Sequence, residues 1–178
     1  MRQTIRVERL LRESVETPYC NLVTRTTGRL VRSSIARELA ADDAPLALLD
    51  FSDVGLVDFS CADEIIAKLL LDPPTGAYLV LQGLGEEQLE AIEHVLQHHE
   101  LAALVHDPAH GGARPVGRVS PDLRTVFFHL REAGPSTAGG LGARMGWAPG
   151  HAADVLDTLV RLRLARVTDG LYALPFDT

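Results

Sequence analysis

The stretch LALLDFSDVGLVDFSCADEI, residues 46–65, decides the fold of the first part of this chain. It opens with LALLDF, a continuous apolar run of strand length that includes Asp50. A polar connection follows, and the run SCADEIIAKLLL then spaces its apolar residues as one face of a helix does, at Ile65, Ile66, Leu69 and Leu70. The stretch therefore predicts a buried strand, a loop and a capped helix.

The chain around this stretch alternates between strand-like and helix-like segments. Helical periodicity runs through 28–41 and 85–99, and strand-like runs lie at 4–10, 20–25, 77–82 and 101–106. Strands that alternate with helices of this length imply crossover units. The sequence thus predicts an α/β domain over residues 1–106 with one mixed sheet and the order β-β-α-β-α-β-α-β.

A change of pattern follows residue 106. Residues 107–120 are rich in Gly and Pro and show no periodicity, which predicts a linker. Ser120 and Pro121 then form a strong helix start, with Gly134 as the stop. Two more helix-like runs precede two short strand-like pieces around Asp169-Gly170, a favoured hairpin turn. Three helices and a hairpin predict a small α+β winged helix-turn-helix domain over residues 121–178.

Composition limits the class of protein. Of 178 residues, 46% are hydrophobic and 23% charged, and no apolar run is long enough to span a bilayer. The first residues do not resemble a signal peptide, and two cysteines, Cys20 and Cys61, are too few for a disulfide framework. We therefore expect a cytoplasmic protein without a membrane partner. The net charge of −7 arises before residue 119, where 18 acidic residues face 11 basic ones.

The order of the first domain, together with LALLDFSDVGLVDFSCADEI, resembles the STAS fold of bacterial anti-sigma-factor antagonists. In that family a buried strand leads to an Asp-Ser-Ser-Gly type motif at a helix start, and a partner kinase phosphorylates the second Ser. The resemblance sets Asp58 on the motif Asp and Ser60 on the phosphorylated Ser. Phe59 replaces the first Ser and Cys61 replaces the Gly. The combination of NLVTRTTGRLVRSSI, DFS and ADEII looks closer to the STAS-like domains of unknown function that accompany histidine-kinase-type ATPase modules.

This resemblance implies a protein partner, a histidine-kinase-type ATPase or an anti-sigma-like factor. The partner-binding residues are then expected on the loop and the helix start: Asp53, Asp58, Ser60, Asp63 and Glu64. Ser60 has a second reading that needs no phosphorylation. Its hydroxyl precedes an apolar-periodic helix and Asp63 lies three residues on, so it also fits a helix N-cap in an arrangement like a capping box.

Several polar clusters invite a chemical interpretation, and each has a structural alternative. Asp50, Asp53 and Asp58 lack an accompanying nucleophile, phosphate loop or metal spacing, which favours turn and helix caps over catalysis. His94 and His98 are four apart on a helix, a spacing that suits a metal, but no convincing third ligand accompanies them. The segment 24–28 is expected to form either a helix cap or an anion-binding site. We therefore predict no catalytic residue, no metal and no cofactor.

The second domain resembles the winged helices of bacterial transcription regulators. Its predicted recognition helix, PGHAADVLDTLVRLRL, carries Asp154 and Asp157 and has no Arg or Lys in its first half, which disfavours DNA contact. The residues that remain for DNA binding are Arg144, His151, Arg161 and Arg166. The alternative use of such a domain is protein contact or pairing of two chains, so a homodimer stays open.

Together these patterns predict a non-enzymatic bacterial regulatory protein. It would act by protein–protein interaction through the STAS-like domain, as a partner-switching or signalling adaptor. The alternative is a DNA-binding transcriptional regulator that uses the winged helix.

Overall fold

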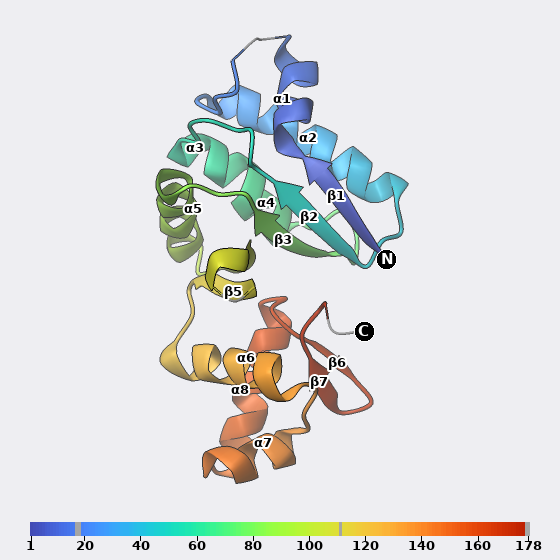
Figure 1. Cartoon of the computed structure of the whole chain (residues 1–178), viewed down its shortest axis with the longest axis vertical. Helices are drawn as coiled ribbons and strands as arrows, with labels where there is room; N and C mark the ends of the chain where they lie inside the picture. Colours follow the sequence, from blue (N-terminus) through green and yellow to red (C-terminus); the bar gives the residue numbers. More distant parts are fainter. Residues whose placement is uncertain (17–18, 111, 177–178) are drawn as a thin grey trace. The chain divides into compact units, whose positions relative to one another are not determined.

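A computed structural model describes residues 1–16, 19–110 and 112–176, which form two compact units, Met1–Gly117 and Arg118–Thr178. The strands of the first unit (Figure 1) are β1 (Arg2–Arg6), β2 (Leu46–Asp50), β3 (Tyr78–Gln82), β4 (Ala102–Asp107) and β5 (Gly112–Gly117). Its helices are α1 (Val7–Val15), α2 (Arg25–Ala41), α3 (Phe59–Ala62), the π-helical turn η1 (Asp63–Ala67), α4 (Lys68–Leu71), α5 (Glu86–His98) and the 3₁₀ turn η2 (Pro108–His110).

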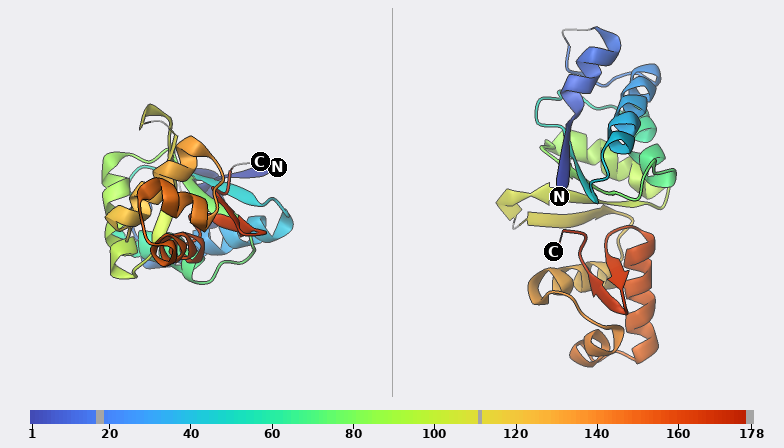
Figure 2. Two further views of the ribbon diagram at one scale, coloured as in Figure 1. Left: turned by 90° about the horizontal axis from the view of Figure 1, so that it is seen from below. Right: turned by 90° about the vertical axis from the view of Figure 1, so that its right-hand side faces the viewer.

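The predicted mixed sheet is confirmed. Its strands stand in the order β1-β2-β3-β4-β5; the first four are parallel, and β5 runs antiparallel to β4. Each parallel connection moves one strand further in the same direction. Right-handed crossovers of this kind put their helices on one face. In the right-hand view of Figure 2, α2 lies on one side of β1 and β2.

The core lies between that face of the sheet and the helices. The strands contribute every second residue, including Ile5, Leu49, Leu81, Val105 and Val116, and these pack in one cluster with apolar residues of the helices. The alternation follows from the two-residue period of a strand. Burial of this apolar surface supplies the main favourable free energy of folding.

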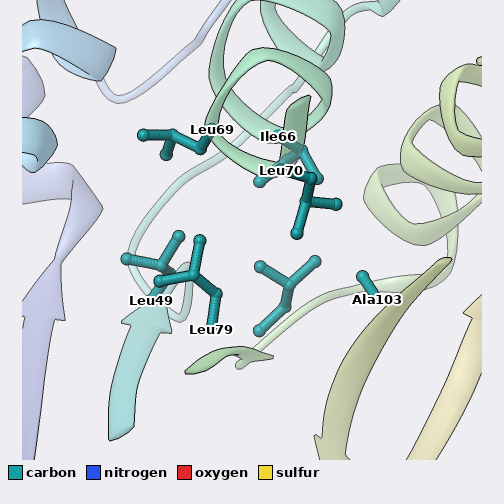
Figure 3. A pocket seen from close by; sticks show the side chains of 7 residues that line it. Leu49, Ile66, Leu69, Leu70, Leu79 and Ala103 are labelled. Atoms are coloured by element: carbon teal, nitrogen blue, oxygen red, sulfur yellow. The ribbon is translucent and has the colours of Figure 1, made fainter. Parts of the chain in front are cut away.

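The helical segment from α3 to α4 lies on the sheet through its apolar side. Figure 3 shows Ile66, Leu69 and Leu70 facing Leu49, Leu79 and Ala103 across a pocket of about 10 Å³, lined also by Leu81. A space of this size holds at most one water and offers it no polar partner, so it is expected to stay dry. This packing fixes the orientation of the helical segment from α3 to α4, so that its polar residues face away from the sheet.

Two predicted strands of this unit are corrected. The strand predicted at 4–10 ends at Arg6, because Val7, Leu10 and Leu11 follow helical spacing and are all buried on one side of α1. The strand predicted at 20–25 is a single bridge from Leu22 to Val57, since Thr24 already caps α2. The observed order of the first unit is therefore β-α-α-β-α-β-α-β-β.

The predicted linker at 107–120 is also corrected, because most of it folds as η2 and β5. Pro115 favoured the prediction of a linker, since proline cannot donate a hydrogen bond to a neighbouring strand. The position is tolerated because β5 is an edge strand, where one side of the backbone needs no partner strand. The division between the two units falls after Gly117 instead of across a fourteen-residue connection.

The second unit contains α6 (Pro121–Ala133), α7 (Ala138–Met145), α8 (Pro149–Arg161), β6 (Arg166–Thr168) and β7 (Leu171–Ala173). Ser120 caps α6 by accepting a hydrogen bond from the Leu123 amide, as the sequence predicted. The hairpin turn holds Asp169 at φ 51° and Gly170 at φ 78°, the left-handed conformation that a tight hairpin needs. Ser136 adds a further antiparallel bridge to Tyr172.

Leu49→Ala should lower the free energy of unfolding by about 2–5 kcal/mol, because Leu49 is fully buried against the helical segment and its truncation leaves a cavity. Chemical denaturation measures this loss. Leu71→Ala is the matched control: Leu71 is 56% exposed at the end of the same segment, and its change should stay within about 0.5 kcal/mol. Equal effects of the two substitutions would contradict the burial of Leu49 against the helical segment.

Candidate functional site

The candidate site is built around the start of α3, where the residues of the quoted stretch meet α2 and α5. Asp58 is the N-cap of α3: its Oδ1 accepts hydrogen bonds from the Cys61 amide and from the Ser60 hydroxyl, both at 2.8 Å. The expectation that Ser60 is the N-cap is therefore wrong. Asp58, two residues earlier, has the extended backbone of a cap, so Ser60 falls in the first helical turn.

The loop before α3 is held in place by several hydrogen bonds. The buried Gln88 side chain donates to the carbonyls of Val54 and Gly55 at 2.6 and 2.5 Å. On the other side, Leu22 donates its amide to Leu56 at 2.7 Å and accepts from the Asp58 amide at 2.9 Å. These contacts hold a surface loop rigid in front of the helix that it enters.

The helical segment contains a π-helical turn, η1, which carries Asp63 and Glu64. Such turns are rare and occur frequently at functional sites. The apolar spacing of the sequence did not predict the π-helical turn. At this level α2 comes so close that a Cβ on Gly28 would lie 3.0 Å from the Cβ of Glu64. The glycine permits the close approach that brings Arg25 within reach of both carboxylates.

A charge network joins the helices at η1. Arg25 Nη1 donates to Asp63 Oδ2 at 2.7 Å and to Glu64 Oε1 at 3.1 Å. Lys68 Nζ donates to the same Glu64 oxygen at 2.5 Å, and Arg32 Nη2 lies 3.6 Å from Oε2. The Glu64 side chain has no solvent exposure. Burial alone would raise the pKa of Glu64, but the hydrogen bonds from Lys68 and Arg25 outweigh it and hold that pKa below its usual value.

Asp63 is neutralised from two sides. Besides Arg25, His99 Nε2 lies 2.6 Å from its second oxygen, Oδ1. Burial opposes ionisation here as well, and the hydrogen bonds from Arg25 and His99 outweigh it, so the pKa of Asp63 is also lowered. Because an ionised carboxylate can only accept, His99 donates its Nε2 proton to Asp63.

A cleft of about 550 Å³ opens beside this network. Its walls come from α2, the start of α3, η1 and the end of α5, and its lining residues are Arg25, Phe59, Ser60, Asp63, His94, Val95, His98 and His99. The volume is within the range of small-molecule sites. The structure thus brings Ser60 together with His94, His98 and His99, of which the sequence singled out the first two only for their spacing on a helix.

The other predicted partner-binding residues are placed differently. Asp53 is separately paired with Arg6 at 2.5 Å, with 58% of its side chain exposed. The prediction that Glu64 binds a partner is wrong, because its carboxylate is fully buried. Glu64 instead forms ion pairs with Arg25 and Lys68. Asp63 and Ser60 line the cleft, and Asp58 holds Ser60.

No catalytic role was predicted for Asp50, Asp53 and Asp58, because their spacing along the sequence matches no catalytic pattern. In the structure, these three side chains make structural contacts. Asp50 Oδ1 accepts from the amide and the hydroxyl of Ser52, at 3.0 and 2.6 Å. The Cys61 thiol donates to the Thr24 carbonyl at 3.0 Å, and burial, followed by the charge of Asp58, raises its pKa to about 12. A thiol held in the protonated form is a poor nucleophile. Among the described residues, no group of three metal-ligating side chains comes together.

Thr24 is a helix cap, which was one of two readings of the segment 24–28. Its hydroxyl accepts from the Thr27 amide at 3.2 Å and starts α2. Arg25 is the residue of that segment that reaches the charge network, and the sequence offered no signal that it would meet Asp63 and Glu64, residues about forty positions away in the chain.

In the second unit, the predicted DNA-binding residues lie on three different elements, α7, α8 and β6. Arg144 is exposed on α7, while His151 is paired with Asp122 at 2.8 Å and lies beside the Trp147 ring. Arg161 donates to Thr158 on its own helix, and Arg166 begins β6. Of the two acidic residues of α8, Asp157 accepts from the Tyr172 hydroxyl at 2.6 Å and Asp154 is exposed.

Comparisons with protein-family models, with curated proteins and with solved structures found no match to this chain. In the part of the chain that the structure describes, none of the helices has the length and apolar character required to cross a membrane.

The charge network should make stability depend on pH in the acidic range. The pKa values of Asp63 and Glu64 are lower in the folded protein than in the unfolded chain, so their ionisation stabilises the fold at pH values above the pKa of the unfolded chain, about 4.3 for Glu. This stabilisation is lost as the pH falls through the pKa values of the folded protein. Glu64→Gln should therefore reduce the decline in unfolding free energy below about pH 5. It should also cost about 1–3 kcal/mol at neutral pH, because it removes the negative charge that pairs with Lys68 and Arg25 and leaves them a neutral, weaker acceptor.

Denaturant titrations of the purified protein at a series of pH values measure both effects. Glu87→Gln is the matched control, since Glu87 is exposed in the first turn of α5 and outside the network. An unchanged pH profile in Glu64→Gln would show that this network does not govern the acid sensitivity.

Proposed function

We propose that this chain is a non-enzymatic bacterial regulatory protein that acts by protein–protein interaction through the unit Met1–Gly117. We propose further that this unit is STAS-like and that its docking surface is the loop and helix start at 56–60. The single observation that supports the proposal is a pair of large exposed apolar side chains, one on the loop and one at the helix start: Leu56 is 47% exposed and Phe59 is 55% exposed.

Exposed apolar anchors with a polar rim are typical of protein interfaces, where aromatic residues contribute much of the binding free energy. Phe59 packs against His94, with ring centroids 4.8 Å apart and the ring planes tilted by 47°, so its ring is already positioned. The hydrogen bonds from Gln88 and Leu22 hold the loop, and little conformational entropy would be lost when a partner binds.

Ser60 is the proposed switch of this surface. Its hydroxyl is half-buried in the cleft and donates to Asp58, the residue that caps α3. A phosphate on Ser60 would remove that donor and place negative charge beside Asp58 and Asp63. Phosphorylation would thereby disturb the docking surface, which suits a partner that binds one form only. A histidine-kinase-type ATPase or an anti-sigma-like factor is the proposed class of partner.

Phe59→Ala should reduce capture of the specific partner at least about tenfold, the effect expected for truncating an aromatic anchor. The tagged full-length protein is used to enrich partners from an extract of its native host, and the enriched proteins are quantified by mass spectrometry. Ser60→Glu should reduce the same partner, whereas Ser60→Ala should retain it.

Leu71→Ala is the control for this experiment, because Leu71 has a similar exposure, 56%, at the far end of the same helical segment. It should leave the captured set unchanged. If Phe59→Ala and Leu71→Ala capture the same proteins in the same amounts as the unaltered chain, docking at this loop is refuted.

A second candidate function is DNA binding, favoured by the layout of the unit Arg118–Thr178. Three helices followed by a tight hairpin suit a winged helix, which we propose for this unit, and Arg144 and Arg166 are cations for phosphate contact. It ranks second because Asp154 is exposed on α8, the proposed recognition helix, and would repel phosphate.

Binding of the full-length protein to genomic duplex DNA separates the two candidates. A DNA-binding regulator should bind at about 50 mM salt, lose affinity steeply by about 200 mM, and be weakened by Arg144→Ala and Arg166→Ala. On the preferred proposal we expect no binding at the lower salt. Tight, salt-sensitive and sequence-selective binding would reverse the ranking.

A further inference from the structure

The cleft beside Ser60 presents hydrogen-bond donors more than acceptors. Arg25 comes from α2, and His94, His98 and His99 come from the last two turns of α5 and the residue that follows it. The sole acidic residue in the described lining is Asp63, and both of its oxygens are already engaged, one by Arg25 and one by His99. Its charge is therefore compensated within the protein.

Arg25 retains donor capacity. Both of its described hydrogen bonds use Nη1, which leaves Nε and Nη2 without an acceptor among the described residues. Its side chain is 50% exposed and lies in the cleft wall. A guanidinium that is fixed at one nitrogen and open at the others is suited to bind a second oxyanion.

His98 adds a second donor. It is exposed, and its described contact is an edge-on approach to the His99 ring, with centroids 5.0 Å apart. The ring nitrogens of His98 have no hydrogen-bond partner in the described part of the chain. A neutral imidazole carries one N–H and a protonated one carries two, so His98 can donate to a bound anion in either state.

The remaining wall is apolar and aromatic. The Phe59 ring packs against the His94 ring at 4.8 Å with a tilt of 47°, and Val95 lies between the histidines on α5. An exposed phenyl face of this kind favours contact with a flat ring. The cleft therefore combines a cationic and polar side with an aromatic side.

We propose that this cleft binds a small molecule in which an oxyanion, a phosphate or a carboxylate, is joined to a planar ring. Arg25 and His98 hold the oxyanion, and Phe59 with His94 contacts the ring. The volume of about 550 Å³ accommodates a molecule of this size. The inference depends on the cleft alone and does not require that a protein docks at Phe59.

The test is a titration of the ¹⁵N-labelled full-length protein with phenyl phosphate and, separately, with benzoate, followed by amide chemical shifts. Saturable shifts should centre on 59–63 and 94–99, with a dissociation constant of about 1 mM for at least one of the two probes. Comparison of the two identifies which oxyanion is preferred. Phenol and inorganic phosphate should each bind at least about tenfold more weakly than the joined molecule.

Two variants test the assigned residues. Arg25→Gln should weaken binding about tenfold, the effect of one charge-assisted hydrogen bond, and His98→Gln about threefold. Arg29→Gln is the matched control, because Arg29 is exposed one turn further along α2 and is not among the residues that line the cleft. His98→Gln keeps the test decisive if Arg25→Gln lowers stability, since His98 makes no described contact with the charge network.

Three results would overturn the proposal. The first is no saturable shift with either probe up to about 20 mM, well above the expected dissociation constant. The second is binding that Arg25→Gln and His98→Gln leave unchanged. The third is binding of phenol as tight as that of phenyl phosphate and benzoate, which would show that the oxyanion contributes nothing. None of these results bears on capture of a protein partner, so the two proposals fail separately.

Discussion

The buried carboxylate of Glu64 is the constraint on which the arrangement of this site depends. A charge without solvent exposure is tolerated only when it is paired and hydrogen-bonded. Lys68 and Arg25 supply the hydrogen bonds and Arg32 supplies further positive charge. Because these cations come from two helices, the carboxylate fixes α2 against the segment that contains η1. Arg25 is thereby held at the edge of the cleft, half-exposed and only partly satisfied.

The two sides of the helical segment Phe59–Leu71 serve different purposes. Its apolar side, with Ile66 and Leu69, packs on the sheet and sets the orientation of the helix. Its polar side carries the network and ends at Ser60, whose hydroxyl Asp58 holds. Rigid packing on one side is what allows precise polar contacts on the other, since a helix free to rotate could not keep Asp63 between Arg25 and His99. The loop at Leu56 gains its rigidity from Gln88 in the same way, through contacts distant in sequence.

Local signals in the sequence predicted much of the secondary structure. Apolar spacing identified α2, α5 and α8, and Ser120 with Pro121 and Gly134 identified α6. Short segments were harder, because an apolar run of a few residues fits a strand or a helix equally well. The end of β1 at Arg6 is one such case. β5 was missed because Pro115 and the glycines are usual signs of a loop, and only the position at a sheet edge makes them compatible with a strand.

The sequence by itself determined the mixed α/β character of the first unit, its longer helices and the cap of α6, because these follow from periodicity and from contacts a few residues apart. Ser60 and Asp63 could be singled out from their spacing at a helix start, whereas Asp58 was singled out through the resemblance to the Asp-Ser-Ser-Gly type motif. Only the tertiary structure decided that Glu64 is buried, that a π-helical turn carries it, and that the histidines at the end of α5 share a cleft with Arg25 and Ser60. These features result from the packing of helices far apart in the chain, and no local pattern records how close two helices will come.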